Sequence, residues 1–154
     1  MRLPVRKSPR IPNYSYSSEN YYFITICTHE KKCVFGLPEK RTALGILAQS
    51  HILDIESHYS NVVIEKFVVM PNHVHMILVL KKGQTANVNH IIGQYKAGVT
   101  REARKAYPNI LLWQRSFHDH VIRKQKSYEK IWAYIENNPI KWEEDCFYRN
   151  DSIV

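Results

Sequence analysis

The hydrophobic and polar positions of the chain follow two different periods, and these periods predict its elements. Aromatic and β-branched segments of four to eight residues are typical of strands, whereas apolar residues spaced three or four apart indicate helices. The strand pattern occurs at residues 21–28, 62–70, 73–80 and 117–123. The helical pattern occurs at residues 39–57, 87–106 and 128–137.

The order of these segments predicts an α+β fold of the ferredoxin-like, split βαβ type (βαββαβ), with an antiparallel sheet and one extra helix towards the C-terminus. Pro71 and Asn72 favour a tight turn between the second and third strands. In this topology the sheet order is 4-1-3-2, so the third strand, 73–80, is central. We expect a basic arm at residues 1–20, one domain at 21–142 and a tail at 143–154.

The third strand carries apolar residues on both of its faces. Val74, Met76 and Leu78 alternate with Ile77 and Val79. A strand of this kind is covered on both sides. We therefore expect the first two helices on one face of the sheet and the third helix on the other.

The charge of the chain favours a polyanionic partner. Its 154 residues include 22 Lys and Arg against 14 Asp and Glu, for a net charge of +8. A basic balance of this size is typical of nucleic-acid-binding proteins. The 10 tyrosines and 3 tryptophans add aromatic faces that suit unstacked bases, although most of these rings are expected in the core.

The cysteines and the apolar runs indicate the compartment. Cys27, Cys33 and Cys146 form no CxxC pair, and an odd number of cysteines argues against a disulfide framework and fits a reducing cytoplasm. The basic, proline-bearing start lacks the apolar stretch of a signal peptide, and Met76 to Leu80 is too short to span a bilayer. We expect a cytoplasmic protein with no membrane partner.

His73 and His75 form the strongest candidate for chemistry. Side chains alternate along a strand, so residues two apart point to the same face. Two imidazoles at the start of a buried central strand are costly unless they have partners, and together they offer two nitrogen ligands to a metal. The alternative is that both are polar residues at a strand entry that backbone or water satisfies.

The last helix supplies a complement to the histidines. Tyr134 and Asn138 are four residues apart and share one helical face, and Pro139 places Asn138 at the helix end. If this face lies over the histidines, Asn138 adds an oxygen ligand and Tyr134 faces the metal. Two nitrogens and one oxygen suit Mg²⁺ or Mn²⁺ and leave room for a phosphate, which the tyrosine hydroxyl can attack. The alternative is that Tyr134 is a core aromatic residue.

At this point the sequence resembles a known family. The segment MPNHVHMILVL at residues 70–80, followed by YIENNPIKW at 134–142, resembles the HUH single-tyrosine transposases of insertion sequences. The segments RIPNYSY, YYFITICT, IIGQYKAGVTREAR and WQRSFHDHVIR are similar to the REP-associated tyrosine transposase branch. The resemblance covers residues 10 to 142 and implies Tyr134 as the catalytic residue, with His73, His75 and Asn138 as metal ligands.

The same resemblance implies the substrate. Family members cut single-stranded DNA beside short hairpins and leave a 5′-phosphotyrosine. A basic helix and an N-terminal arm contact the DNA, which places five cations there: Arg6, Arg10, Lys96, Arg101 and Arg104. Relatives act as monomers or as homodimers that exchange the last helix, and either state is compatible with the sequence.

Three alternatives stay open. His118 and His120 form a second HxH pair that rivals the first, with His120 otherwise a partner that supports a metal ligand. A non-catalytic nucleic-acid-binding module of the same fold would show stacking aromatics on an exposed sheet face. A structural metal protein would combine the histidines with Cys27 and Cys33.

Overall fold

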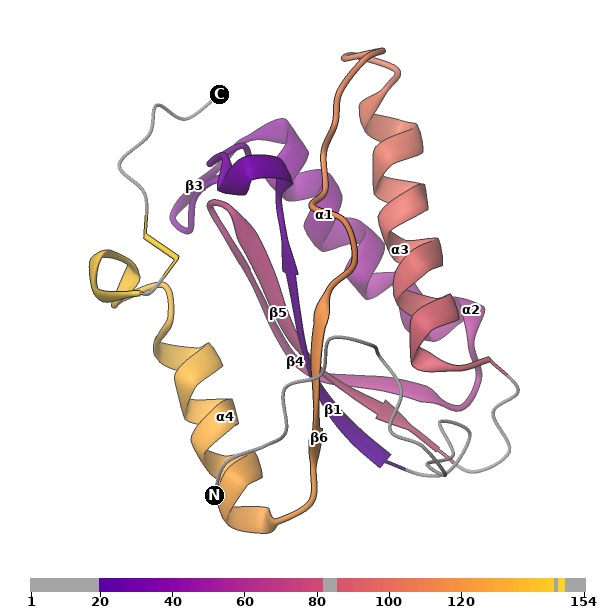
Figure 1. Cartoon of the computed structure of the whole chain (residues 1–154), viewed down its shortest axis with the longest axis vertical. Coiled ribbons are helices and arrows are strands. Elements are labelled where there is room, and N and C mark those ends of the chain that lie inside the picture. Colours follow the sequence, from indigo (N-terminus) through magenta and orange to yellow (C-terminus); the bar gives the residue numbers. More distant parts are fainter. Residues whose placement is uncertain (1–19, 82–85, 146, 149–154) are drawn as a thin grey trace.

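A computed structural model describes residues 20–81, 86–145 and 147–148 of the chain (Figure 1). Six strands occur in this part: β1 (Asn20–Cys27), β2 (Gly36–Leu37), β3 (Lys40–Arg41), β4 (Val62–Met70), β5 (His73–Leu80) and β6 (His118–Ile122). Its α-helices are α1 (Ala43–Leu53), α2 (Ile55–His58), α3 (Val88–Ala103) and α4 (Gln125–Asn137). Single 3-10 turns occupy η1 (His29–Lys31) and η2 (Trp142–Glu144).

The main sheet has the order β4-β5-β1-β6, and its pairs are antiparallel. This is the predicted order 4-1-3-2, so the ferredoxin-like α+β prediction is confirmed. Strand β5 is central and buried along its whole length. It pairs with β1 from Asn20↔Leu80 to Cys27↔His73 and with β4 up to Met70↔His73.

Helices cover both faces of the sheet, as expected. Figure 1 shows α1, α2 and α3 on one side and α4 on the other. Val74, Met76 and Leu78 belong to the larger core beneath α1 and α3. Ile77 belongs to the smaller core, where it packs with Ile135 of α4. The central strand is therefore held rigidly between two apolar layers.

Each predicted helix differs from the structure at a boundary: the segment expected at 39–57 forms two helices, α1 and α2, and the helix expected at 87–106 ends at Ala103. The helix expected at 39–57 begins at Ala43, because residues 36–41 form the small β2–β3 hairpin and Thr42 caps the helix by accepting from Gly45 N at 3.2 Å. The last helix begins at Gln125 rather than at 128. Its N-cap, Lys124, makes no capping bond with its side chain, so no local signal marks that start.

The basic arm, with Arg6 and Arg10, lies outside the described residues. The tail expected from residue 143 is described in part, at residues 143–145 and 147–148. Phe147 and Tyr148 pack with Trp142 against the smaller core. None of the helices in the described ranges has both the length and the apolar character needed to cross a membrane.

Candidate metal and nucleophile site

His73 and His75 leave the same face of β5, as the alternation predicted, and their ring centroids are 4.5 Å apart. Both side chains are essentially buried, with exposed fractions of 0% and 2%. The Nε2 atom of each ring is buried and has no hydrogen-bond partner. Two buried nitrogens without partners are unusual in a folded protein and point to a ligand.

A neighbouring amide fixes the proton of His73. Asn72 donates from Nδ2 to the carbonyl oxygens of Lys31 and Phe147, at 3.1 and 2.8 Å. Its Oδ1 therefore faces His73 Nδ1, at 2.8 Å, and can only accept. The proton of His73 must lie on Nδ1, so Nε2 carries a lone pair, which is the form of imidazole that binds metals.

His75 is supported from the adjacent strand. Its Nδ1 atom lies 2.9 Å from the hydroxyl oxygen of Thr25, which is paired with His75 across the β1–β5 ladder. Burial lowers the pKa of both histidines. At His73 this effect is opposed by the carboxylate of Asp145 and by the side chain of Asn138, and at His75 it is reinforced by the charge of His73. Both rings are therefore neutral near pH 7, as metal ligands need to be.

Asn138 joins the histidines from the end of α4. It is 3% exposed and keeps helical backbone angles, φ −56° and ψ −45°, although Pro139 follows it. Its Nδ2 donates to Asp145 Oδ2, and its Oδ1 is buried without a partner. Because a carboxylate only accepts, the amide is oriented with Oδ1 as the remaining ligand atom.

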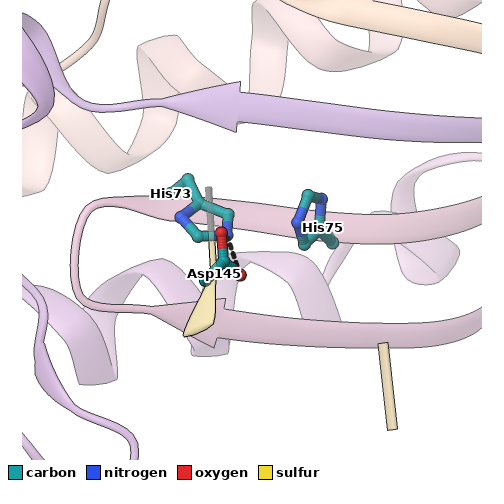
Figure 2. Close-up of side chains that lie close together, drawn as sticks. All are labelled: His73, His75 and Asp145. Atoms are coloured by element: carbon teal, nitrogen blue, oxygen red, sulfur yellow. Dashed lines mark ion pairs between the residues drawn. The ribbon is translucent and has the colours of Figure 1, made fainter. Parts of the chain in front are cut away.

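Asp145 is a site residue that the sequence did not predict. Its side chain is fully buried, and Oδ2 lies 4.0 Å from His73 Nε2 (Figure 2). Ligand atoms of His73, His75 and Asp145 all lie within 4.8 Å of one another. Asp145 falls in the segment that we expected to be a tail outside the domain. The apolar neighbours Trp142, Phe147 and Tyr148 were the available signal that this segment packs.

Tyr134 lies on the exposed side of the site. Its ring centroid is 5.3 Å from that of His75 and 6.3 Å from that of Phe23, and the residue is 40% exposed. The prediction that Tyr134 and Asn138 face the histidines together agrees with this arrangement. A core role for Tyr134 does not fit its exposure, because Ile135 is the α4 residue that is buried in the smaller core.

The supporting role of His120 stays a prediction. Thr25 and Asn72 occupy the Nδ1 atoms of His75 and His73, and the ring centroid of His120 lies 6.3 Å from that of Phe23. His118 is exposed. Among the residues that the structure describes, the cluster able to hold a metal includes neither histidine of this second pair, nor Cys27 or Cys33.

The predicted DNA-binding cations of α3 lie in the helical layer on the opposite face of the sheet. Lys96 Nζ donates to the carbonyl oxygens of Gln114 and Ser116, at 3.0 and 2.8 Å, and burial lowers its pKa. Arg104 donates to the carbonyl oxygen of Ile110, while Arg101 is exposed. Lys96 and Arg104 thus hold the segment after α3, and their contact with DNA stays a prediction.

Comparison with known proteins decides the family. The family model for IS200-like transposases matches residues 15–138, which include both histidines, Tyr134 and Asn138. The chain belongs to the IS200-like transposase family. This transposase is 36% identical to an uncharacterized protein of Haemophilus influenzae over an alignment of 167 residues that covers 93% of each chain.

Two solved structures share the fold of this transposase. One is a REP-associated tyrosine transposase bound to a REP hairpin, with a TM-score of 0.63 and 21% identity over 86% of this chain and 74% of that one. The other is a Deinococcus radiodurans R1 protein thought to be a transposase, with a TM-score of 0.56 and 18% identity over 84% of this chain and 97% of that one. At these identities the likeness concerns the fold.

Proposed function

We propose that this transposase nicks and rejoins single-stranded DNA, with Tyr134 as the nucleophile and a divalent metal held by His73, His75 and Asn138. The observation that carries the proposal is the set of three buried atoms without partners, His73 Nε2, His75 Nε2 and Asn138 Oδ1. They gather beside the exposed Tyr134. Leaving three such atoms unpaired in a folded core costs free energy that a bound ion would offset.

The residues fit a hard divalent cation. Two neutral imidazoles and one amide oxygen, with the Asp145 carboxylate close by, are compatible with Mg²⁺ or Mn²⁺, and the imidazoles favour Mn²⁺. When bound, such an ion supplies Lewis-acid polarisation of a phosphate oxygen. The asparagine and threonine contacts described above hold the ligand atoms in place beforehand.

Tyr134 is the nucleophile in the proposed reaction. Its hydroxyl oxygen attacks phosphorus and forms the new phosphoester bond, and the bond from phosphorus to the 3′-oxygen breaks. The tyrosine loses its proton and the departing 3′-oxygen gains one, so the products are a 5′-phosphotyrosine and a free 3′-hydroxyl. Because the phosphoester energy is kept, a 3′-hydroxyl can reverse the step and join the strand to a new end.

We propose single-stranded DNA beside a hairpin as the substrate. The net charge of +8 and membership of a transposase family support a DNA substrate. The fold neighbour bound to a REP hairpin supports the hairpin as the feature recognised. This assignment places the chain in the REP-associated branch, whose motifs it resembles.

The test uses the full chain with a labelled hairpin oligonucleotide that has single-stranded extensions, in Mn²⁺ or Mg²⁺, followed by a denaturing gel. Repeats from the host genome supply the hairpins. We expect a band at the mass of protein plus DNA that is lost with chelator and in Tyr134→Phe. Tyr107→Phe is the matched control, because Tyr107 is similarly exposed at 46% and follows α3.

The outcomes separate the proposals. An adduct that persists in Tyr134→Phe would assign the nucleophile to another tyrosine. Tight hairpin binding without an adduct in either metal would favour a binding module without catalysis.

A further inference from the structure

A polar cavity lies at the opposite end of the sheet from the histidines. It has a volume of about 440 Å³ and is formed by the start of β1, the end of β6, the start of α4 and Glu65 of β4. This volume is within the range of pockets that hold small ligands. Its principal side chains are Tyr21, Glu65, Arg123, Lys124 and Tyr128.

The cavity presents an aromatic ring and positive charges, two kinds of group that bind a nucleotide. Tyr21 is 36% exposed and presents its ring edge-to-face with Tyr128, at a centroid distance of 5.7 Å. Exposed aromatic faces of this kind stack on unpaired bases. Arg123 and Lys124 are both exposed and supply positive charge for a phosphate.

The carboxylate of Glu65 gives the cavity chemical selectivity. It is oriented by a hydrogen bond from the Tyr128 hydroxyl, and burial, together with this bond, raises the pKa of Tyr128 to about 12. A carboxylate repels phosphate but accepts from amino groups on base edges. Cytosine, adenine and guanine each carry an amino group that can donate to a carboxylate, whereas thymine has none and presents carbonyl oxygens.

An aromatic path connects the cavity to the nucleophile. Tyr21 and Phe23 are two apart on β1, about 6.6 Å along the strand, and point to the same face. The ring of Phe23 is 6.3 Å from that of Tyr134. This path from Tyr21 through Phe23 to Tyr134 is thus about 13 Å long, which at 3.4 Å or more per nucleotide corresponds to roughly two to four nucleotides.

We infer that this cavity is a base-reading pocket that holds one unpaired base with an amino group (cytosine, adenine or guanine) of the DNA strand, two to four nucleotides from the scissile phosphate. The base stacks on Tyr21, its amino group donates to Glu65, and Arg123 and Lys124 hold the adjoining phosphate. The inference rests on the proposed function, because it assumes a single-stranded DNA substrate. It adds a sequence requirement that is separate from the hairpin.

The test measures binding of the full chain to a fluorescent hairpin with four-nucleotide extensions on both sides. Each extension position is replaced in turn by thymine and by an abasic residue. At one position we expect either replacement to weaken binding by roughly 5- to 150-fold. The thymine penalty should fall below about twofold in Glu65→Gln, and the abasic penalty should fall likewise in Tyr21→Ala.

Two controls isolate the pocket. Glu39→Gln changes an exposed glutamate of the β2–β3 turn and should keep both penalties. A hairpin without extensions should bind wild type and Glu65→Gln equally. A flat profile over all positions, or a thymine penalty that survives in Glu65→Gln, would contradict the pocket while leaving adduct formation intact. Absence of both hairpin binding and adduct would contradict the nuclease proposal itself.

Discussion

Two asparagine amides determine which atoms of the site remain open to a ligand. Asn72 has both of its Nδ2 donations directed at carbonyl oxygens, and Asn138 donates to a carboxylate. These donations fix the orientation of each amide, so that Asn72 Oδ1 faces His73 Nδ1 and Asn138 Oδ1 is left without a partner. The single tautomer of His73 and the open Oδ1 of Asn138 both follow from these contacts, so the site is oriented before any ion arrives.

Asp145→Asn tests this orientation. An asparagine keeps an oxygen for the Phe147 amide, which now bonds Asp145 Oδ1 at 2.8 Å, but it removes the obligatory acceptor for Asn138 Nδ2. We expect Mn²⁺ affinity, measured by calorimetry, to fall by roughly 10- to 100-fold. Glu143→Gln, an exposed neighbour, is the control and should bind as the wild type does. Equal affinities for both variants would show that Asp145 does not orient the ligand.

The buried histidines predict an acid-sensitive fold when no metal is present. Burial lowers the pKa of both, so between the ordinary value of 6.5 and the folded value the unfolded chain binds more protons. Stability is fully present above pH 6.5 and declines as the pH falls below it. Between pH 7.5 and 5.5 in chelator we expect a loss of roughly 2 kcal/mol in urea unfolding. In His75→Gln the loss should shrink by about half, and an undiminished loss would assign the effect to other groups.

At the scale of elements, the position of α1 depends on a close approach at Gly45. A Cβ atom on this residue would lie 2.2 Å from the carbonyl oxygen of Phe35, in the loop before β2. A Cβ atom on Gly93 in α3 would have no neighbouring atom within 4 Å. A side chain at Gly45 would therefore clash with the loop, whereas a side chain at Gly93 has room.

Matched alanine substitutions test this contrast. Gly45→Ala should destabilise the protein by about 1–3 kcal/mol, because the helix must shift away from the loop. Gly93→Ala should stabilise it by roughly 0.4–1 kcal/mol, because alanine narrows the unfolded ensemble and favours the helix. Thermal and urea unfolding of both variants measures the two signs. If Gly93→Ala were less stable than the wild type, the free space around this Cβ position would not be what decides its stability.

The periodic elements were predictable from the sequence, and the irregular ones were not. Alternation identified β5 and placed His73 and His75 on one face, because a buried strand leaves a strong pattern. The β2–β3 hairpin is two residues long on each side, too short for a period to emerge. Asp145 follows a single 3-10 turn, and only tertiary packing brings it to His73.

At the scale of the whole molecule, the candidate site is complete within one chain. His73 and His75 come from β5, Asn138 and Tyr134 from α4, and Asp145 from the segment after η2. In the fold, α4 packs against the sheet of its own chain (Figure 1). We therefore expect the transposase to act in cis, with no helix exchanged between subunits.

Mixing two inactive variants distinguishes the assemblies. Tyr134→Phe lacks the nucleophile and His75→Ala lacks a metal ligand. If the dimer exchanges its helices, each mixed dimer contains one intact site and one site with both defects, whereas sites in cis are all defective. We expect no phosphotyrosine adduct after the two proteins are unfolded and refolded together. Recovery of roughly a quarter to a half of the wild-type adduct would establish exchange instead.

The contact between Asn72 and His73 also allows the metal site of the free protein to be observed by NMR. A proton that is held on Nδ1 by one oxygen, inside a core that water does not reach, exchanges slowly with solvent. Nitrogen-15 spectra can therefore resolve the His73 ring as one tautomer, distinct from the averaged signals of exposed rings. Binding of an ion at Nε2 would move that resonance while the Nδ1 proton stays in place, so occupancy can be followed directly, without DNA and without turnover.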